Sequence, residues 1–154
     1  MLYAPDGDIC GIIGIHVDDI LCAGHGATFD SKMKTLEGKL PFGSRKYGKF
    51  TYCGLRHEQH ADGSITVDQE EYIEQLQPMA NKHLKDNQAI PASERTNYKF
   101  LVGGLAWPAV NTRPDAAFDV SWIASKGEEA TGADVRFGNK LQRCLDGEGS
   151  SDIF

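Results

Sequence analysis

Two adjacent carboxylates stand between two apolar runs near the start of the sequence. Asp18 and Asp19 lie within the stretch GIIGIHVDDILCAG, residues 11–24. Asp is common in turns because its side chain hydrogen-bonds the local backbone, so such a pair can be purely structural. Here the flanks are almost entirely apolar, and carboxylates at the end of a buried strand pair are costly unless solvent or a cation compensates their charge. Because hard divalent ions such as Mg²⁺ prefer oxygen ligands, the pair is a candidate metal site.

Other potential ligands give weaker patterns. The segment HEQH at residues 57–60 places two histidines three positions apart, and on a strand such residues face opposite sides, which disfavours a shared metal. A zinc site of His16, His25 and Asp18 has no stronger support. Cys22 lies in an apolar strand and is expected to be a core residue rather than a reactive thiol. Arg113 either contacts nucleic acid or pairs with an acid, and we expect the structural pairing.

Composition limits the class of protein. The 154 residues fit one domain, with 40% hydrophobic and 25% charged residues, as in ordinary globular proteins. There is no run of about 18 apolar residues and no secretory signal pattern, so neither a membrane span nor export is predicted. The four cysteines lack C-x-x-C spacing, which favours reduced thiols and an intracellular location, cytoplasmic or nuclear.

Charge is unevenly distributed along the chain. The net charge of -6 disfavours a free-standing nucleic-acid binder. Between Ser31 and Lys49, however, one acid, Glu37, accompanies six basic residues: Lys32, Lys34, Lys39, Arg45, Lys46 and Lys49. We call these six residues the basic strip. A strip of this kind is compatible with a phosphate contact surface and equally with a solvated helix face.

Hydrophobic spacing predicts an order of hairpin, helix and hairpin in the first half of the chain. The runs 9–15 and 20–23 are separated by four residues, which is hairpin spacing. Apolar residues recur at helical intervals from Phe29 to Leu40. Residues 50–59 and 64–67 flank a Gly-containing turn and are expected to form a second hairpin.

Helices are predicted for the second half. Asp68 with Glu71 has capping-box spacing and opens a helix that Pro78 stops. After a polar linker at 81–91, a second helix runs over 93–106 and is closed by Trp107-Pro108, with Gly103-Gly104 packed against another backbone. Further helices begin at Thr112-Arg113-Pro114-Asp115 and at Thr131 with Asp134, and the tail 147–154 is expected to fray. This order of elements indicates an α+β fold.

Three segments resemble copia-type retrotransposon reverse transcriptases. HVDDILCAG resembles the Tyr-Val-Asp-Asp hairpin of that family. YCGLRHEQHADGSITVDQEEYIEQL is similar to the segment in which a Leu-Gly-apolar strand leads through a turn to a Gln-X-X-Tyr helix. YKFLVGGLAWPAVNTRPDAAFDVSWIAS is similar to the block that ends in Thr-Arg-Pro-Asp. The three motifs occur in the family's order between Ile9 and about Leu145, which makes the match specific.

The resemblance implies a Pol polyprotein fragment that acts in RNA-directed DNA polymerisation. Residues 1–67 would be a partial palm, 68–146 a helical thumb and connection region, and 147–154 a disordered tail. The implied partners are an RNA or DNA primer-template, deoxynucleoside triphosphates and the rest of the polyprotein, without a membrane. Asp18 and Asp19 would be catalytic ligands of Mg²⁺. The implied nucleic-acid contacts are His16, Lys32, Lys46, Lys49, Tyr52 and Gly54.

Two departures from the family pattern concern individual residues. His16 stands where the family has Tyr beside the primer end, and Cys53 stands where it has Leu before Gly54.

A further departure concerns the metal site. The family's other essential carboxylate lies on an upstream strand, whereas eight residues precede Ile9 here. Asp8 cannot replace it, because an extended strand would separate Asp8 from the hairpin tip by about 25 Å. We therefore expect a chain that is not a competent polymerase alone. The alternative is a non-catalytic remnant or interaction module that retains the fold.

Overall fold

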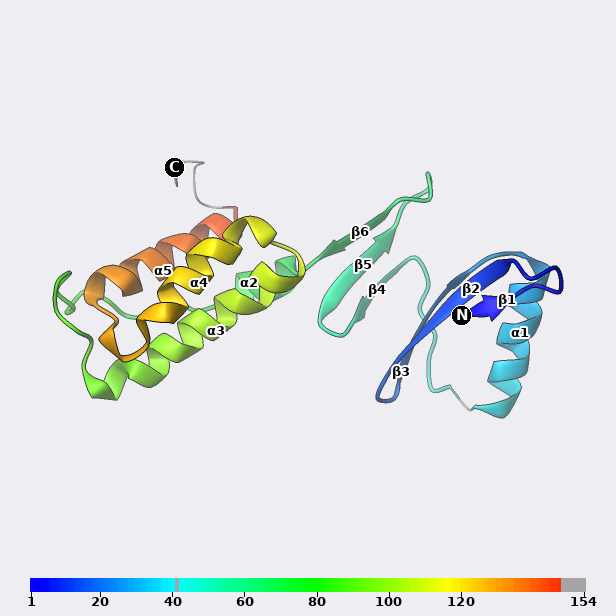
Figure 1. The fold of residues 1–154 in the computed structure, drawn as a ribbon, viewed down its shortest axis with the longest axis horizontal. Coiled ribbons are helices and arrows are strands. Elements are labelled where there is room, and N and C mark those ends of the chain that lie inside the picture. Colours follow the sequence, from blue (N-terminus) through cyan, green and yellow to red (C-terminus); the bar gives the residue numbers. More distant parts are fainter. Residues whose placement is uncertain (41, 148–154) are drawn as a thin grey trace. The chain divides into compact units, whose positions relative to one another are not determined.

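The computed structural model describes residues 1–40 and 42–147, and the chain divides into two compact units at Val67/Asp68. The first unit holds two three-stranded sheets, ordered β1-β2-β3 and β4-β5-β6, and one helix. The second is helical. The expected α+β class is therefore confirmed (Figure 1). The elements of the first unit are β1 (Leu2–Tyr3), β2 (Ile9–His16), β3 (Asp19–Gly24), α1 (Gly26–Lys39), β4 (Lys49–Tyr52), β5 (Leu55–Gln59) and β6 (Ile65–Asp68).

Helix α1 packs on the first sheet through one aromatic ring. Gly11 of β2 pairs with Gly24 of β3, and the ring of Phe29 lies against both. A Cβ atom at Gly11 would come within 2.5 Å of Phe29 Cδ2, and one at Gly24 within 2.3 Å. The paired glycines therefore provide the space in which the helix meets the sheet.

The first predicted hairpin has a tighter turn than expected, whereas the second is present as β5–β6 with its turn at the expected place but is preceded by a further hairpin. His16 pairs with Asp19, so the first turn contains two residues rather than four. Residues 50–59, expected as one strand, form a hairpin of their own in which Tyr52 pairs with Leu55. The chain reverses there because Cys53 and Gly54 both adopt positive φ, at 50° and 76°. This is the conformation that a two-residue mirror-image turn requires.

The second unit is built around three helices. Helices α3, α4 and α5 contact one another, and Leu105, Ile123 and Val135 at their centre have no exposed surface. The elements of this unit are α2 (Glu70–Gln75), η1 (Ala92–Glu94), α3 (Arg95–Asn111), η2 (Pro114–Ala116), α4 (Ala117–Lys126), η3 (Gly127–Glu129) and α5 (Gly132–Leu145), which Figure 1 labels in part.

The expected linker at 81–91 contains no helix or regular strand, but it is packed against α5. The Arg136 guanidinium donates to the backbone carbonyls of Asn81 and Leu84 and pairs with Asp86. Ala89 forms a β-bridge with Thr131 at the start of α5. These contacts fix the segment, so it does not behave as a free linker.

The predicted end of a helix at Trp107-Pro108 is wrong, because α3 continues to Asn111 with Pro108 inside it. A proline cannot donate to the carbonyl four residues earlier, which here belongs to Gly104. The Tyr72 hydroxyl donates to that oxygen at 3.2 Å and replaces the missing bond. Gly104 also faces the Leu76 side chain, so its close neighbour is a side chain and not the expected backbone.

One of the two predicted helix caps is correct. Thr131 and Asp134 form the box at the start of α5. Asp68 does not cap α2, whose N-cap is Gln69; the Asp68 carboxylate instead accepts from the Glu70 backbone N–H. The start of a helical segment at Pro114 is confirmed. The predicted fraying of the tail falls on residues 148–154, which lie outside the described part of the chain.

The described residues include no helix that is both long enough and apolar enough to cross a membrane.

Candidate active site

The two predicted catalytic carboxylates lie at the tip of the β2–β3 hairpin. Val17 and Asp18 form the turn, and Asp19 is the first residue of β3. Both carboxylates are exposed to solvent, as is His16 at the end of β2. The strands that lead to this tip are themselves largely exposed, so the strand pair is not buried as expected, and solvent or a bound group can compensate the charge of the carboxylates.

The turn is strained at Val17. Its φ is +55°, which is unfavourable for a β-branched residue and costs about 1–3 kcal/mol. The side chain is 86% exposed, so burial does not offset this cost. The two-residue connection requires a positive φ at its first central position, and the tight register of the hairpin imposes it on Val17.

The donor set at this tip does not fit a complete two-metal site. Polymerases use two Mg²⁺ ions to activate the primer hydroxyl and to stabilise the leaving oxygen, and such a pair needs oxygen ligands on several sides. Within residues 1–40 and 42–147, no cluster of three or more His, Cys, Asp or Glu side chains is placed to hold a metal. Asp18 and Asp19 can therefore supply part of such a site only.

The β4–β5 hairpin carries a cluster of aromatic rings. Phe50 and His57, which pair across the two strands, stack with centroids 5.4 Å apart and an interplanar angle of 7°. Tyr52 meets the His57 ring edge-on at 6.3 Å. The His57 ring is further fixed by its Nδ1 contact with the Leu55 carbonyl oxygen at 3.0 Å. The predicted contact residue Gly54 forms the turn beside this cluster.

The surroundings of Tyr52 in the β4–β5 hairpin raise the pKa of its phenol. Desolvation raises the pKa of its phenol most, neighbouring Cys53 raises the pKa further, and the negative charge of Asp19 adds to the shift.

The basic strip is partly neutralised. Arg45 pairs with Glu37 at 2.6 Å and Lys49 pairs with Glu58 at 2.9 Å, and the Lys49 contact lowers the pKa of the Glu58 carboxyl. The remaining members of the strip are exposed and have no acidic partner among the described residues: Lys32, Lys34, Lys39 and Lys46. These four lysines are the available phosphate contacts, whereas the predicted contact Lys49 is already paired.

Other candidate residues have structural contacts. His60 Nε2 bonds the Thr66 hydroxyl at 2.7 Å, so it does not share a ligand with His57. The Arg113 guanidinium donates two hydrogen bonds to the Asp115 carboxylate and a third to the Leu145 carbonyl at the end of α5. Cys22 is half-buried, and burial raises the pKa of its thiol, which disfavours the reactive thiolate.

Two features of the site were missed from sequence. The positive φ of Val17 has no signal in its residue type, because valine disfavours that conformation. The stacked Phe50–His57 pair could have been found by treating Cys53-Gly54 as a turn, since the hairpin register then pairs the two residues.

No protein-family model matches the sequence, and comparisons with curated proteins and with solved structures also gave no match.

Proposed function

We propose that this chain is part of a copia-type reverse transcriptase, an RNA-directed DNA polymerase. The proposal rests on one arrangement: Asp18 and Asp19 lie at the tip of a tight hairpin, which is followed along the chain by α1 and by the β4–β5 hairpin. This is the order of elements that the sequence resemblance implies. Residues 1–67 would be part of the palm and residues 68–146 the thumb and connection region.

The proposed roles follow from the positions of the side chains. Asp18 and Asp19 supply two carboxylates toward Mg²⁺, which would serve the nucleotidyl transfer when bound. The free lysines contact phosphates of an RNA or DNA primer-template, while His16, Tyr52 and Gly54 lie around the primer end. Deoxynucleoside triphosphates would be the second substrate. Because the described residues supply an incomplete donor set, we propose that this chain binds primer-template but does not polymerise unaided.

The second candidate is a non-catalytic remnant or interaction module. It is favoured by the incomplete donor set and by His16, which replaces the family's Tyr. The two candidates differ in one respect that can be measured. A polymerase part recognises a primer-template through the first unit, whereas an interaction module has no such preference.

Fluorescence anisotropy with a labelled RNA–DNA hybrid tests nucleic-acid binding. We expect the double variant Lys32→Glu/Lys46→Glu to reduce the slope of log K against log salt by about two, because each phosphate contact contributes about 0.9. The double variant Lys82→Glu/Lys99→Glu changes net charge equally in the second unit and serves as the matched control. Equal weakening by both variants, or no binding by the wild type, would contradict the proposal.

Primer extension tests the incomplete site separately. With Mg²⁺ and nucleotides, the purified chain is expected to give no extension product. A product that disappears in Asp18→Asn would show that this chain assembles a complete metal site.

A further inference from the structure

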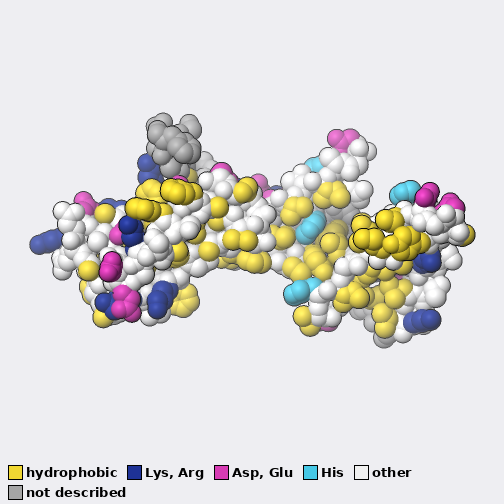
Figure 2. Space-filling view, viewed as in Figure 1, with side chains coloured by type: hydrophobic (Ala, Val, Ile, Leu, Met, Phe, Trp, Pro, Cys, Tyr) yellow, Lys and Arg dark blue, Asp and Glu magenta, His cyan; other side chains and the backbone are white. Residues whose placement is uncertain are grey.

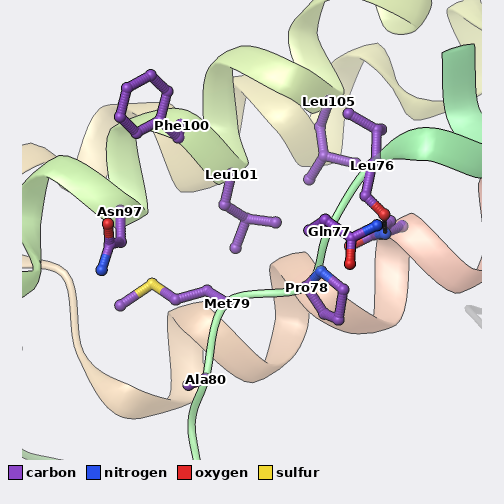
Figure 3. Close-up of a pocket in the computed structure, with 10 residues that line it drawn as sticks. Leu76, Gln77, Pro78, Met79, Ala80, Asn97, Phe100, Leu101 and Leu105 are labelled. Atoms are coloured by element: carbon purple, nitrogen blue, oxygen red, sulfur yellow. Dashed lines mark hydrogen bonds between the residues drawn. The ribbon is translucent and has the colours of Figure 1, made fainter.

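The groove between helix α3 and the extended segment 76–80 of the second unit is a packing feature without charged groups. Figure 3 shows Leu101 and Leu105 pointing from α3 toward this segment, with Met79 on the opposite side. Asn139 of α5 accepts from the Met79 backbone N–H at 2.9 Å and donates to the Met79 carbonyl at 2.7 Å, so the segment is held by its backbone. The lining residues are apolar or amides, and none of them is ionisable. Nothing in this lining selects one class of ligand.

Tyr47 of the first unit, in contrast, exposes an aromatic ring among the residues of the basic strip. Its side chain is 80% exposed, the highest value among the aromatic side chains that the structure describes. Both faces of the ring are therefore open to solvent, and no other described aromatic ring packs on them. Tyr47 lies between Lys46 and Lys49, in a stretch that contains no acidic residue from position 38 to position 57.

The backbone that follows Tyr47 is fixed at the start of β4. The Lys49 N–H donates to the Tyr47 carbonyl at 2.7 Å across Gly48, whose φ of +68° is a conformation that favours glycine. The Gly48 carbonyl accepts from the N–H of Gln59, the last residue of β5, at 2.7 Å. The ring therefore projects from a turn that is joined to the sheet and not from a free loop.

The side chain of Arg45 ties the same segment to α1. Its guanidinium hydrogen-bonds the Tyr47 hydroxyl and pairs at 2.6 Å with the Glu37 carboxylate in the last turn of α1. Both bonds raise the pKa of Arg45, and the bond to Tyr47 raises it most. The phenol oxygen is thus held at one edge of the ring while the faces stay exposed. Because the side chain is already ordered, it loses less conformational freedom when a partner covers the ring.

An ordered, exposed ring among unpaired cations has the composition of a surface that binds single-stranded nucleic acid. Such surfaces combine positive groups that follow the phosphate backbone with aromatic rings on which unpaired bases stack. Lys46, next to Tyr47, and Lys39, in the last turn of α1, are exposed and have no acidic partner among the described residues. A base inside a duplex is already stacked on both sides, so an unpaired base is the one that the ring can cover.

We propose that Tyr47 stacks on an unpaired base of a single-stranded RNA or DNA segment whose phosphates contact Lys39 and Lys46. This assignment rests on the proposed nucleic-acid role of the first unit and adds a base contact to the phosphate contacts. Because every base has an aromatic face, the contact carries little sequence preference.

Two single strands of equal length provide the test, one built of thymidylates and one of abasic sites. The strands carry the same phosphates and differ in their bases, so electrostatic attraction to the basic strip is the same for both. Their affinities for the full chain are measured by fluorescence anisotropy. We expect the wild type to bind the thymidylate strand about tenfold more tightly, the order of affinity that one stacked base contributes.

Substitution of Tyr47 tests the same contact from the protein side. Tyr47→Leu should bind both strands equally and should keep the wild-type salt dependence, because no phosphate contact is lost. Tyr47→Phe retains the ring and should retain the preference for the thymidylate strand. Tyr3→Leu is the matched control, because it removes a 51% exposed tyrosine of the first unit outside the basic strip, and it should also retain the preference.

Equal binding of the two strands by the wild type, a preference that survives in Tyr47→Leu, or its loss in Tyr3→Leu would each overturn this assignment. If the RNA–DNA hybrid still binds in that case, the proposed function stands without the base contact. A wild type that binds neither the hybrid nor either single strand would overturn both. Because the two strands are compared on the intact wild-type chain, the test does not depend on the folding of a variant.

Discussion

The two units of this chain bury their apolar residues very differently. In the second unit, fourteen hydrophobic residues from Ile73 to Leu145 form one buried core. In the first unit, Cys10 is the one buried hydrophobic residue among those described. Ile9, Ile12 and Ile15 of β2 remain at least half exposed. Figure 2 shows hydrophobic side chains gathered on the surface over the first sheet.

This difference separates the residues that hold the fold from the residues for which a function is proposed. The second unit places its buried amides and its Arg113 contact where they hold helices and segments together. The first unit places Asp18 and Asp19 at an exposed hairpin tip and its unpaired lysines on the exposed surface of α1 and of the segment that follows it, while its clustered aromatic rings lie on the half-buried β4–β5 hairpin. An open apolar sheet with a charged tip is an arrangement suited to contacts with other molecules.

The largest expected effect on stability comes from opening a cavity in the core of the second unit. Leu105→Ala should destabilise the second unit by about 2–5 kcal/mol, because the side chain is fully buried. Ile12→Ala is the matched change in the first unit, where 53% of the side chain is exposed, and should cost less than about 0.5 kcal/mol. Hydrogen exchange read separately for the two units measures both effects. Similar losses would contradict the contrast between the units.

Loss of the amide that holds the segment 76–80 should be the next largest effect. Asn139→Ala leaves the Met79 N–H and carbonyl without partners in a buried site and should cost about 2–3 kcal/mol. Asn111→Ala, which removes an exposed bond to the Trp107 carbonyl, serves as the control. Urea denaturation is the measurement. Equal urea midpoints for the two variants would show that the buried hydrogen bonds of Asn139 contribute little to stability.

A smaller loss of stability is expected when the buried phenol hydroxyl of Tyr98 is removed. Its hydroxyl donates to the Ile123 carbonyl at 2.7 Å, and burial, with the charge of Asp134, raises its pKa from 10.0 to about 12. The folded protein keeps this proton to a higher pH than the unfolded chain does. The contribution of the phenol to the free energy of unfolding is therefore complete below pH 10 and is lost as pH rises through about 12. Tyr98→Phe should cost about 1 kcal/mol at neutral pH.

Melting temperatures between pH 9 and 12 check the Tyr98 prediction. The wild type should lose more stability over this range than Tyr98→Phe does. Parallel curves for the two proteins would contradict the assigned pKa.

The smallest effect should be a gain in the first unit. Val17→Gly relieves the positive φ at the hairpin turn and should stabilise it by up to about 1 kcal/mol, since the strain exceeds the extra entropy that glycine loses on folding. Amide exchange of β2 and β3 measures this gain. Val67→Gly lies outside the turn and should give no gain; faster exchange in Val17→Gly would show that the turn is not strained.

Local chemistry explains which parts of the fold could be predicted. Thr131 and Asp134 form a capping box because both partners lie within one helical turn. Pro108 misled the prediction because Tyr72, which supplies the missing donor, lies 36 residues earlier in the sequence. At the candidate site, the two carboxylates and the hairpin that carries them could be predicted from the local sequence. The stacking of Phe50 on His57 could not be predicted in the same way, because it depends on a two-residue turn at Cys53-Gly54 inside a segment that was expected to be one strand.

Photocrosslinking from the primer end tests the proposed function most directly. A primer with 4-thiothymidine at its 3′ terminus is annealed to an RNA template, irradiated with the full chain and mapped by mass spectrometry. We expect crosslinks at the hairpin tips, residues 16–19 and 52–54, that are lost when the thio-base is moved to the 5′ end. Crosslinks confined to the basic strip or the second unit, regardless of the position of the thio-base, would contradict a polymerase-type primer site.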